Sequence, residues 1–278
     1  DVLSQHECPL CRQALHIRYD RLISETASTF HRSKRRKPST VDPHEVFKKL
    51  LALKKKDKYR VFTRTLKRFA NAAVSEEDLE QLDQDIQNFY DQQGICHVVV
   101  PEKGHLKPGM FCVGGDSHSP TGGAFGAYMF GIGATEMAGV LATGEIWLKV
   151  PKTIYIKWKG KLNRLVTAKD MMLATCRQIG MGGGQYQAIQ YIGDAIYDLS
   201  VQDRMTLSNM AAELGAQTGL IAPDEKTIRF INQSGGLVPE NWKSFCLDKP
   251  ASNANVTEFD ASILSPQIAA PHSPENSE

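Results

Sequence analysis

The chain has 278 residues, of which 41% are hydrophobic and 23% charged, and its formal net charge is +2. It is long enough for one large α/β domain or two smaller ones, and its composition is ordinary for a soluble globular protein. No apolar run approaches the roughly 20 residues that a membrane-spanning helix needs, and no basic-then-apolar signal segment is present. We therefore expect a cytoplasmic protein that does not associate with membranes or bind polyanions in general.

Residues 1–93 differ in composition from the rest and predict a mostly helical, basic region. A basic run at 32–37 precedes apolar residues at helical spacing between residues 44 and 73. Lysine and arginine are frequent between residues 48 and 68, so the region could bind nucleic acid or another anionic surface. The alternative is a solvated helix face, which the scarcity of aromatic residues favours.

Cys8 and Cys11 form the one Cys-x-x-Cys pattern of the chain. With histidines nearby at positions 6, 16 and 31, they could hold a zinc ion. A single pair without a second one is weak support for a metal site. The other four cysteines are scattered, and free thiols in a reducing compartment are their expected state.

From Gly94 onward, short apolar segments alternate with glycine turns, which predicts a three-layer αβα domain at 94–278. Expected strands are 97–100, 110–114, 153–158, 187–192 and a final strand-like piece at 257–269. Expected helices are 124–143, 167–179 and a helix start or loop at 200–214. A glycine turn is expected at 180–184, and irregular structure at 234–255.

Residues 114–123, with the sequence GGDSHSPTGG, combine more reactive groups than any other part of the chain. The flanking glycines permit tight turns and a close approach of the backbone to a ligand. Asp116, Ser117 and His118 place an acid, a hydroxyl and an imidazole in consecutive positions, which suits proton transfer on a small polar substrate. The alternative is a surface turn whose Asp and Ser only cap the next helix.

This loop is one of several segments whose sequence and order resemble the aconitase family, and most closely the large subunit of 3-isopropylmalate dehydratase. The segments are 94–97, 101–104, 108–110, 114–133, 142–147 and 208–216. The resemblance covers about residues 94–278 and leaves 1–93 unmatched. It implies a partial aconitase-like domain of a hydro-lyase that dehydrates and rehydrates a hydroxy di- or tricarboxylic acid such as 3-isopropylmalate, in leucine biosynthesis. It also implies a [4Fe–4S] cluster and a separate small subunit.

The resemblance assigns roles to six side chains, in which His97 pairs with Asp116 and His118 with Glu213. The implied catalytic residues are His97, Asp116, His118 and Glu213, and the implied substrate-binding residues are Ser117 and Asn209. Two such couples would hold imidazoles in chosen tautomers, so that a proton follows a fixed path. Taken singly, His97 would more often be a satisfied buried histidine, Glu213 a surface charge and Asn209 a cap.

The chain departs from the family's pattern in its metal ligands. The family binds its cluster through cysteines in a Cys-Thr-Asn and a Cys-x-x-Cys motif, and neither motif occurs in residues 94–278. Cys96 and Cys112 are expected to be small buried apolar residues. The family's early Asp-His pair has no convincing match either. The alternative to a hydro-lyase segment is therefore an inactive remnant whose basic region binds nucleic acid or zinc.

Overall fold

In a computed structural model of the chain, the structure describes residues 90, 93–143, 145–246, 250 and 254–278. The chain divides into two compact units, one formed by 22–94 and one that contains 95–278 together with 1–21. The predicted basic helices and the zinc candidates Cys8 and Cys11 lie outside the described residues. No helix in the described ranges is long and apolar enough to cross a membrane.

Two parallel sheets organise the unit that contains 95–278. The larger has strand order β5-β4-β3-β6 and consists of β3 (Thr153–Lys159), β4 (Ala188–Ile192), β5 (Thr218–Ile221) and β6 (Val256–Asp260). All of its strand pairs are parallel. The smaller pairs β1 (Phe111–Gly114) with β2 (Tyr128–Gly131), also in parallel, so that Gly114 lies opposite Gly131. The predicted α/β class is therefore confirmed, and the structure shows in addition that both sheets are parallel.

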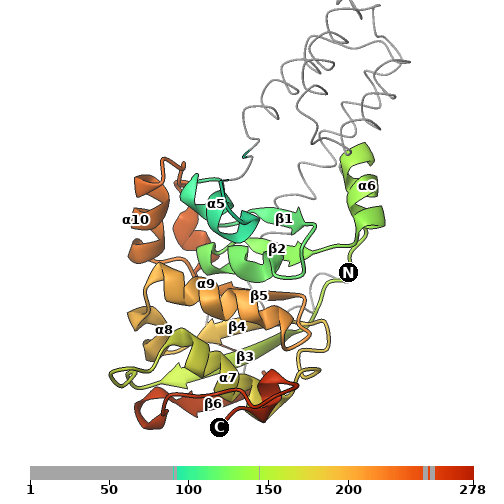
Figure 1. Cartoon of the computed structure of the whole chain (residues 1–278). Coiled ribbons are helices and arrows are strands. Elements are labelled where there is room, and N and C mark those ends of the chain that lie inside the picture. Colours follow the sequence, from blue (N-terminus) through green and yellow to red (C-terminus); the bar gives the residue numbers. More distant parts are fainter. Residues whose placement is uncertain (1–89, 91–92, 144, 247–249, 251–253) are drawn as a thin grey trace, which may run out of the picture. The chain divides into compact units, whose positions relative to one another are not determined.

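Helices α7 (Ala168–Ile179) and α9 (Val201–Asn209) lie on the same face of the larger sheet (Figure 1). Strand residues on this face alternate along each strand, as a pleated sheet requires. The main hydrophobic core forms between them and includes Ile156, Ile189, Tyr191, Met171 and Leu207. The short helix α8 (Asp194–Asp198) contributes Ala195 and Ile196 to the same core.

The opposite face of the larger sheet carries Ala188 and Leu220, which cluster with Tyr128 and Phe130 of β2. Phe245 of η4 (Trp242–Phe245) joins this second cluster. The smaller sheet is therefore packed onto the larger one through apolar side chains. Among the described residues, helices cover one face of the larger sheet, and the smaller sheet covers part of the other.

The remaining elements lie around these sheets. They are α5 (Cys96–Glu102), η2 (Ser119–Phe125), α6 (Ala134–Thr143), η3 (Met210–Ala212), α10 (Glu225–Gln233), η5 (Ala261–Ile263) and η6 (Pro274–Asn276). A third apolar cluster joins Leu106, Phe125 of η2, Val201 of α9 and Ile231 of α10. This cluster ties η2 to α9, the two elements that carry the site described below.

Helix α7 forms where the sequence predicts it, because its first turn is capped. Thr167 and Asp170 form a reciprocal capping box, in which the Asp170 carboxylate accepts from the Thr167 N–H at 2.7 Å. The helix ends at Gly180, whose φ of 82° few other residues adopt. Three strands are also confirmed where predicted, with small differences in their bounds: β1, β3 and β4. The strand-like piece predicted at 257–269 is a strand only as far as Asp260, where η5 begins, and β5 was not predicted.

Two element predictions are wrong. Residues 97–100 form part of helix α5, not a strand, although three consecutive valines at 98–100 favour a strand. The single helix predicted at 124–143 is instead the end of η2, strand β2 and helix α6. Strand β2 owes its conformation to pairing with β1, which is a contact that local composition does not encode.

Candidate active site

The Asp-Ser-His loop connects β1 to η2 and is held by its own backbone. The Asp116 carbonyl accepts the Ser119 N–H at 3.1 Å and the Ser119 hydroxyl at 2.7 Å. His118 is the residue that immediately precedes η2. Because η2 is buried along its whole length, it anchors the C-terminal end of the loop, while Asp116 and Ser117 remain exposed to solvent.

Two glycines allow the loop and η2 to lie close to neighbouring backbone. A Cβ atom at Gly131 would lie 2.5 Å from the Asp116 carbonyl oxygen, and one at Gly123 would lie 1.8 Å from the Gly219 carbonyl oxygen. Both distances are too short for any side chain. The site therefore depends on direct backbone contact with the end of β2 and with β5.

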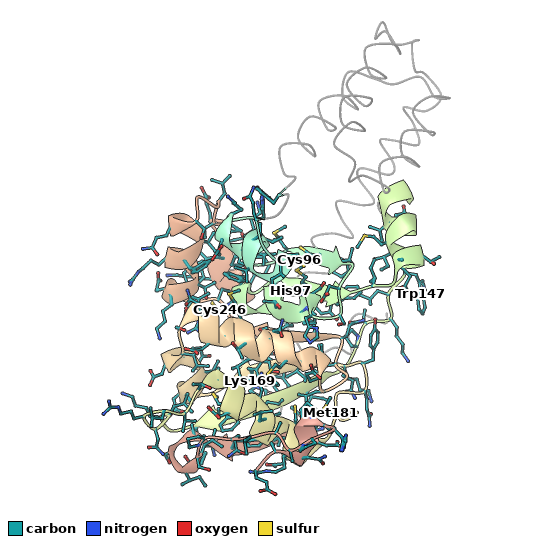
Figure 2. The ribbon with its side chains drawn as sticks, in the orientation of Figure 1. Cys96, His97, Trp147, Lys169, Met181 and Cys246 are labelled. Atoms are coloured by element: carbon teal, nitrogen blue, oxygen red, sulfur yellow. The ribbon has the colours of Figure 1, made fainter. Side chains whose placement is uncertain are left out.

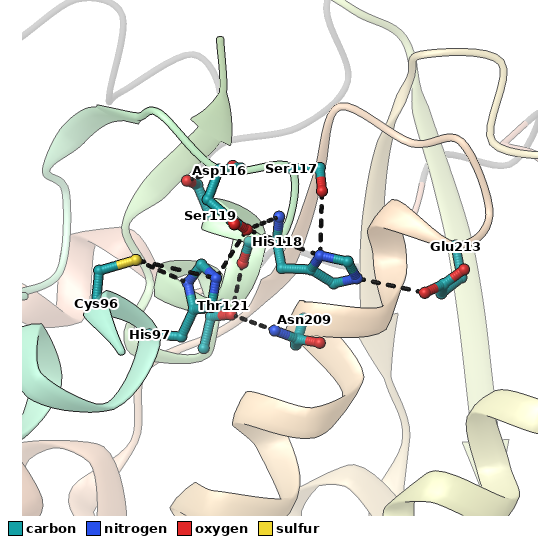
Figure 3. A network of polar contacts seen from close by, with 9 residues as sticks. All are labelled: Cys96, His97, Asp116, Ser117, His118, Ser119, Thr121, Asn209 and Glu213. Atoms are coloured by element: carbon teal, nitrogen blue, oxygen red, sulfur yellow. Dashed lines mark hydrogen bonds and ion pairs between the residues drawn. The ribbon is translucent and has the colours of Figure 1, made fainter. Parts of the chain in front are cut away.

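The first imidazole–carboxylate couple joins α5 to the loop. His97 Nε2 lies 2.8 Å from Asp116 Oδ1, and the His118 backbone N–H donates to the same oxygen at 2.7 Å (Figure 3). The hydrogen bond from the His118 N–H, followed by that from His97, lowers the pKa of Asp116 below its ordinary value. The Asp116 carboxylate is therefore ionised at neutral pH and orients the His97 ring.

The second couple joins the loop to the segment after α9. His118 Nε2 lies 3.3 Å from Glu213 Oε1, and His118 Nδ1 lies 3.1 Å from the Ser117 hydroxyl (Figure 3). A Glu213 carboxylate can only accept a hydrogen bond, so it places the ring proton of a neutral His118 on Nε2. The Ser117 hydroxyl then donates to Nδ1.

The two couples form one site. The ring centroids of His97 and His118 are 6.3 Å apart, and Asp116 Oδ1 is 3.7 Å from His118 Nδ1. The exposed fractions are 13% for the His97 side chain, 35% for His118, 53% for Asp116 and 33% for Glu213. The groups are therefore paired with one another yet accessible to a small molecule.

Asn209 and Ser117 lie beside these couples. The Asn209 side-chain N–H donates to the Thr121 hydroxyl at 2.9 Å, and Ser117 is exposed. The structure thus brings together all six side chains that the resemblance selects, and their roles remain predictions. Sequence reasoning missed Thr121. A signal for it exists, because a hydroxyl three residues after a loop residue can donate back to that residue's carbonyl.

The prediction that Cys96 is buried is wrong. Cys96 is exposed on α5, and its Sγ lies 3.6 Å from Nδ1 and 3.9 Å from Nε2 of His97 (Figure 2). The Cys96 thiol is therefore in contact with the His97 ring. Cys112 is half-buried. The thiol of Cys96 therefore borders the site.

The described residues do not fit an iron–sulfur cluster. Such a cluster is held mainly by cysteine thiolates, and the cysteines in the described part, Cys96, Cys112, Cys176 and Cys246, are not grouped into a set of metal ligands. In the same part of the chain, no group of three or more His, Cys, Asp or Glu side chains could hold a metal ion. These cysteines therefore do not provide the ligands for the [4Fe–4S] cluster that the resemblance implies.

These observations define a parallel α/β domain whose loops present two imidazole–carboxylate couples. The sequence of residues 21–277 matches the Aconitase family (aconitate hydratase). The chain therefore belongs to the aconitase family. The match begins at residue 21, so it includes most of the region for which the sequence reasoning found no counterpart.

Several named relatives are large subunits of 3-isopropylmalate dehydratase or of homoaconitase. The chain is 46% identical over 195 residues to a probable 3-isopropylmalate dehydratase large subunit of Methanothermobacter thermautotrophicus, covering 70% of this chain and 46% of that protein. It is 44% identical over 207 residues to a 3-isopropylmalate dehydratase large subunit of Methanopyrus kandleri, covering 74% and 48%. It is 45% identical over 195 residues to a probable methanogen homoaconitase large subunit of Methanosarcina mazei, covering 70% and 49%. The chain spans about half the length of these relatives.

Proposed function

We propose that this chain supplies the imidazole–carboxylate half of the active site of a hydro-lyase that acts on a hydroxy di- or tricarboxylic acid. The observation that carries the proposal is the meeting of His97, Asp116, His118 and Glu213 in one solvent-accessible site. These side chains come from three segments distant in sequence, so the fold, not local sequence, assembles them. A site with two positioned imidazoles is suited to a reaction that moves two protons.

Dehydration of a hydroxy acid requires one proton to leave carbon and another to reach the departing hydroxyl. In the first couple, Asp116 holds His97 Nε2 at 2.8 Å, so that Nδ1, which lies 3.6 Å from Cys96 Sγ, is the ring nitrogen that can take up or release a proton. In the second, Glu213 holds His118 Nε2 at 3.3 Å, and the Ser117 hydroxyl can relay a proton to or from Nδ1. Each couple thus keeps its ring oriented while a proton arrives or leaves.

The named relatives support a proposal for the substrate and for the partner. Two of them are 3-isopropylmalate dehydratase large subunits and one is a homoaconitase large subunit, so we propose 3-isopropylmalate or a similar acid as substrate. The term large subunit implies a separate small subunit, which we propose as the partner. Residence in the cytoplasm, expected from the sequence, is part of the same proposal.

The test is a chimaera in which this chain is continued by the remaining part of the Methanothermobacter thermautotrophicus relative and paired with a small subunit. Incubation with 3-isopropylmalate in deuterated water should give an unsaturated acid and deuterium in the recovered substrate, both measured by NMR. His118→Asn and Glu213→Gln should each lower kcat by about 100-fold or more, because each removes one partner of a couple. His272→Asn and Glu240→Gln, at exposed positions, are the matched controls.

Near-normal rates in both couple variants would overturn the site assignment. A chimaera that folds but neither forms an unsaturated acid nor exchanges protons with any of the acids tested would overturn the proposed reaction.

A further inference from the structure

Thr121 occupies a central position behind the second couple. It belongs to η2 and is 4% exposed. Its hydroxyl donates to the His118 carbonyl at 2.7 Å and accepts from the Asn209 side chain at 2.9 Å (Figure 3). Because this buried hydroxyl donates one hydrogen bond and accepts another, it links the two segments of the chain that carry its partners.

These two segments are the ones that carry the second couple. His118 provides the imidazole, and Asn209 ends α9, from which the turn η3 leads directly to Glu213. The contacts therefore close a ring of four residues. Thr121 bonds His118 and Asn209, and the backbone leads from Asn209 to Glu213. Glu213 then completes the ring through its 3.3 Å contact with His118. Of the four side chains named in this ring, Thr121 is buried, whereas those of His118, Asn209 and Glu213 are half-buried.

We propose that Thr121 is a positioning residue that sets the distance between His118 and Glu213. The inference rests on the proposed function for its catalytic consequence, but not for its geometry. The His118 carbonyl keeps a second donor, the Thr121 backbone N–H at 3.1 Å. Loss of the hydroxyl therefore leaves the turn closed and removes the hydrogen bond to Asn209, the polar contact that Thr121 adds to the apolar packing between η2 and α9.

The chain offers a matched control for this hydroxyl. Thr175 in α7 is completely buried, and its hydroxyl donates to the Met171 carbonyl at 2.7 Å. Thr175→Val removes the same kind of bond from a helix of the main core, outside the site. Thr121→Ser is the conservative variant, because it keeps the hydroxyl and loses only a methyl group.

The experiment measures the ring ¹⁵N signals of His118 in the 278-residue chain by NMR, since these signals report which nitrogen carries the proton. In the wild-type chain we expect the proton on Nε2, held by Glu213. Thr121→Val should shift the signals towards a mixture of both tautomers, Thr121→Ser should restore them, and Thr175→Val should leave them unchanged. Should Thr121→Val fail to fold, Asn209→Ala breaks the same bond from its half-buried partner and is expected to give the same shift.

In the chimaera, Thr121→Val should lower kcat by about tenfold with little change in KM, because a displacement of roughly 1 Å can cost up to about 100-fold. Unchanged His118 signals in Thr121→Val and Asn209→Ala would overturn the positioning role. A shift of these signals in a chimaera that lacks hydro-lyase activity would support the positioning role and contradict the proposed function, so that the two failures can be told apart.

Discussion

The main core and the loop site use polar side chains in opposite ways. In the core, Arg204 is fully buried and donates to Asp224 at 2.6 Å and to the Tyr197 carbonyl at 3.0 Å. In the site, the couples are equally well paired, but a third to a half of the His118, Glu213 and Asp116 side chains is exposed. Pairing in the core holds the fold together, whereas pairing in the site fixes orientation and leaves the reactive atoms accessible.

The comparison has a direct consequence for mutagenesis. Substitutions in the core and in the elements packed against it should change the free energy of unfolding. Substitutions at the two couples should change proton transfer and have little effect on the free energy of unfolding. Four experiments test this difference between the core and the site, beginning with the one of largest expected effect.

Gly123→Ala should abolish or severely weaken folding. The new Cβ would lie 1.8 Å from the Gly219 carbonyl oxygen, which belongs to the backbone of β5 and cannot move away. We expect a loss of about 3 kcal/mol or more, measured by urea unfolding. Gly139→Ala is the control, because a Cβ there meets nothing within 4 Å and a helical alanine is favoured over glycine by roughly 1 kcal/mol. Equal stability of the two variants would contradict the close packing of η2 against β5.

Arg204→Met should lower the free energy of unfolding by about 2 kcal/mol, because it removes the fully buried member of an ion pair and leaves Asp224, whose side chain is 27% exposed, without its arginine partner. Lys157→Met is the matched control. Lys157 pairs with Glu258 at 2.9 Å, but both side chains are more than a third exposed, so its loss should cost less than about 1 kcal/mol. Similar costs for the two substitutions would show that the Arg204 pair is not a core contact.

Acid should destabilise the main core through Asp170. Burial acts to raise the pKa of Asp170, but hydrogen bonds from the Gln267 N–H and from Thr167 outweigh it and lower the pKa below 3.8. The unfolded state therefore binds this proton at higher pH than the native state. Its contribution is complete above pH 3.8 and is lost as the pH falls towards the lowered native pKa. In Asp170→Asn, unfolding free energies measured across this range should depend less steeply on pH, whereas Glu240→Gln should keep the wild-type slope.

Thiol reactivity should separate the two regions without any mutation. Cys96 is exposed beside the site, and Cys176 is buried in α7. Burial raises the pKa of Cys176 from 9.0 to about 11, which lowers its thiolate fraction about 100-fold. At neutral pH, iodoacetamide should modify Cys96 and spare Cys176 until the protein is unfolded, as measured by mass spectrometry. Equal labelling of both cysteines in the native protein would contradict the structure of the core.

The elements that sequence predicts correctly are those with local signals. Thr167, Asp170 and Gly180 mark both ends of α7, and alternating apolar residues mark β3. The helix α5 was missed because its valines favour a strand, and the extended Ile95 that precedes it gives no side-chain cap. Strand β2 was missed because its pairing with β1 follows a crossover through η2.

For the site, sequence alone could select residues but not place them. His97, Asp116, His118 and Glu213 were selected by the order of family motifs, and only the fold shows that they meet. The exposure of Cys96 could not be foreseen, because a cysteine is more often buried than not. Thr121 was missed because its importance comes from Asn209, a residue 88 positions away in sequence.

The most direct test of the central claim uses Asp116, whose carboxylate lies near both imidazoles, at 2.8 Å from His97 and 3.7 Å from His118. The measurement is the ring ¹⁵N spectrum of the histidine-labelled chain with Asp116→Asn, using the exposed His272 as internal reference. We predict that the signals of His97 and His118 both move while those of His272 stay in place. If neither His97 nor His118 responds more than His272, the two couples do not form one site.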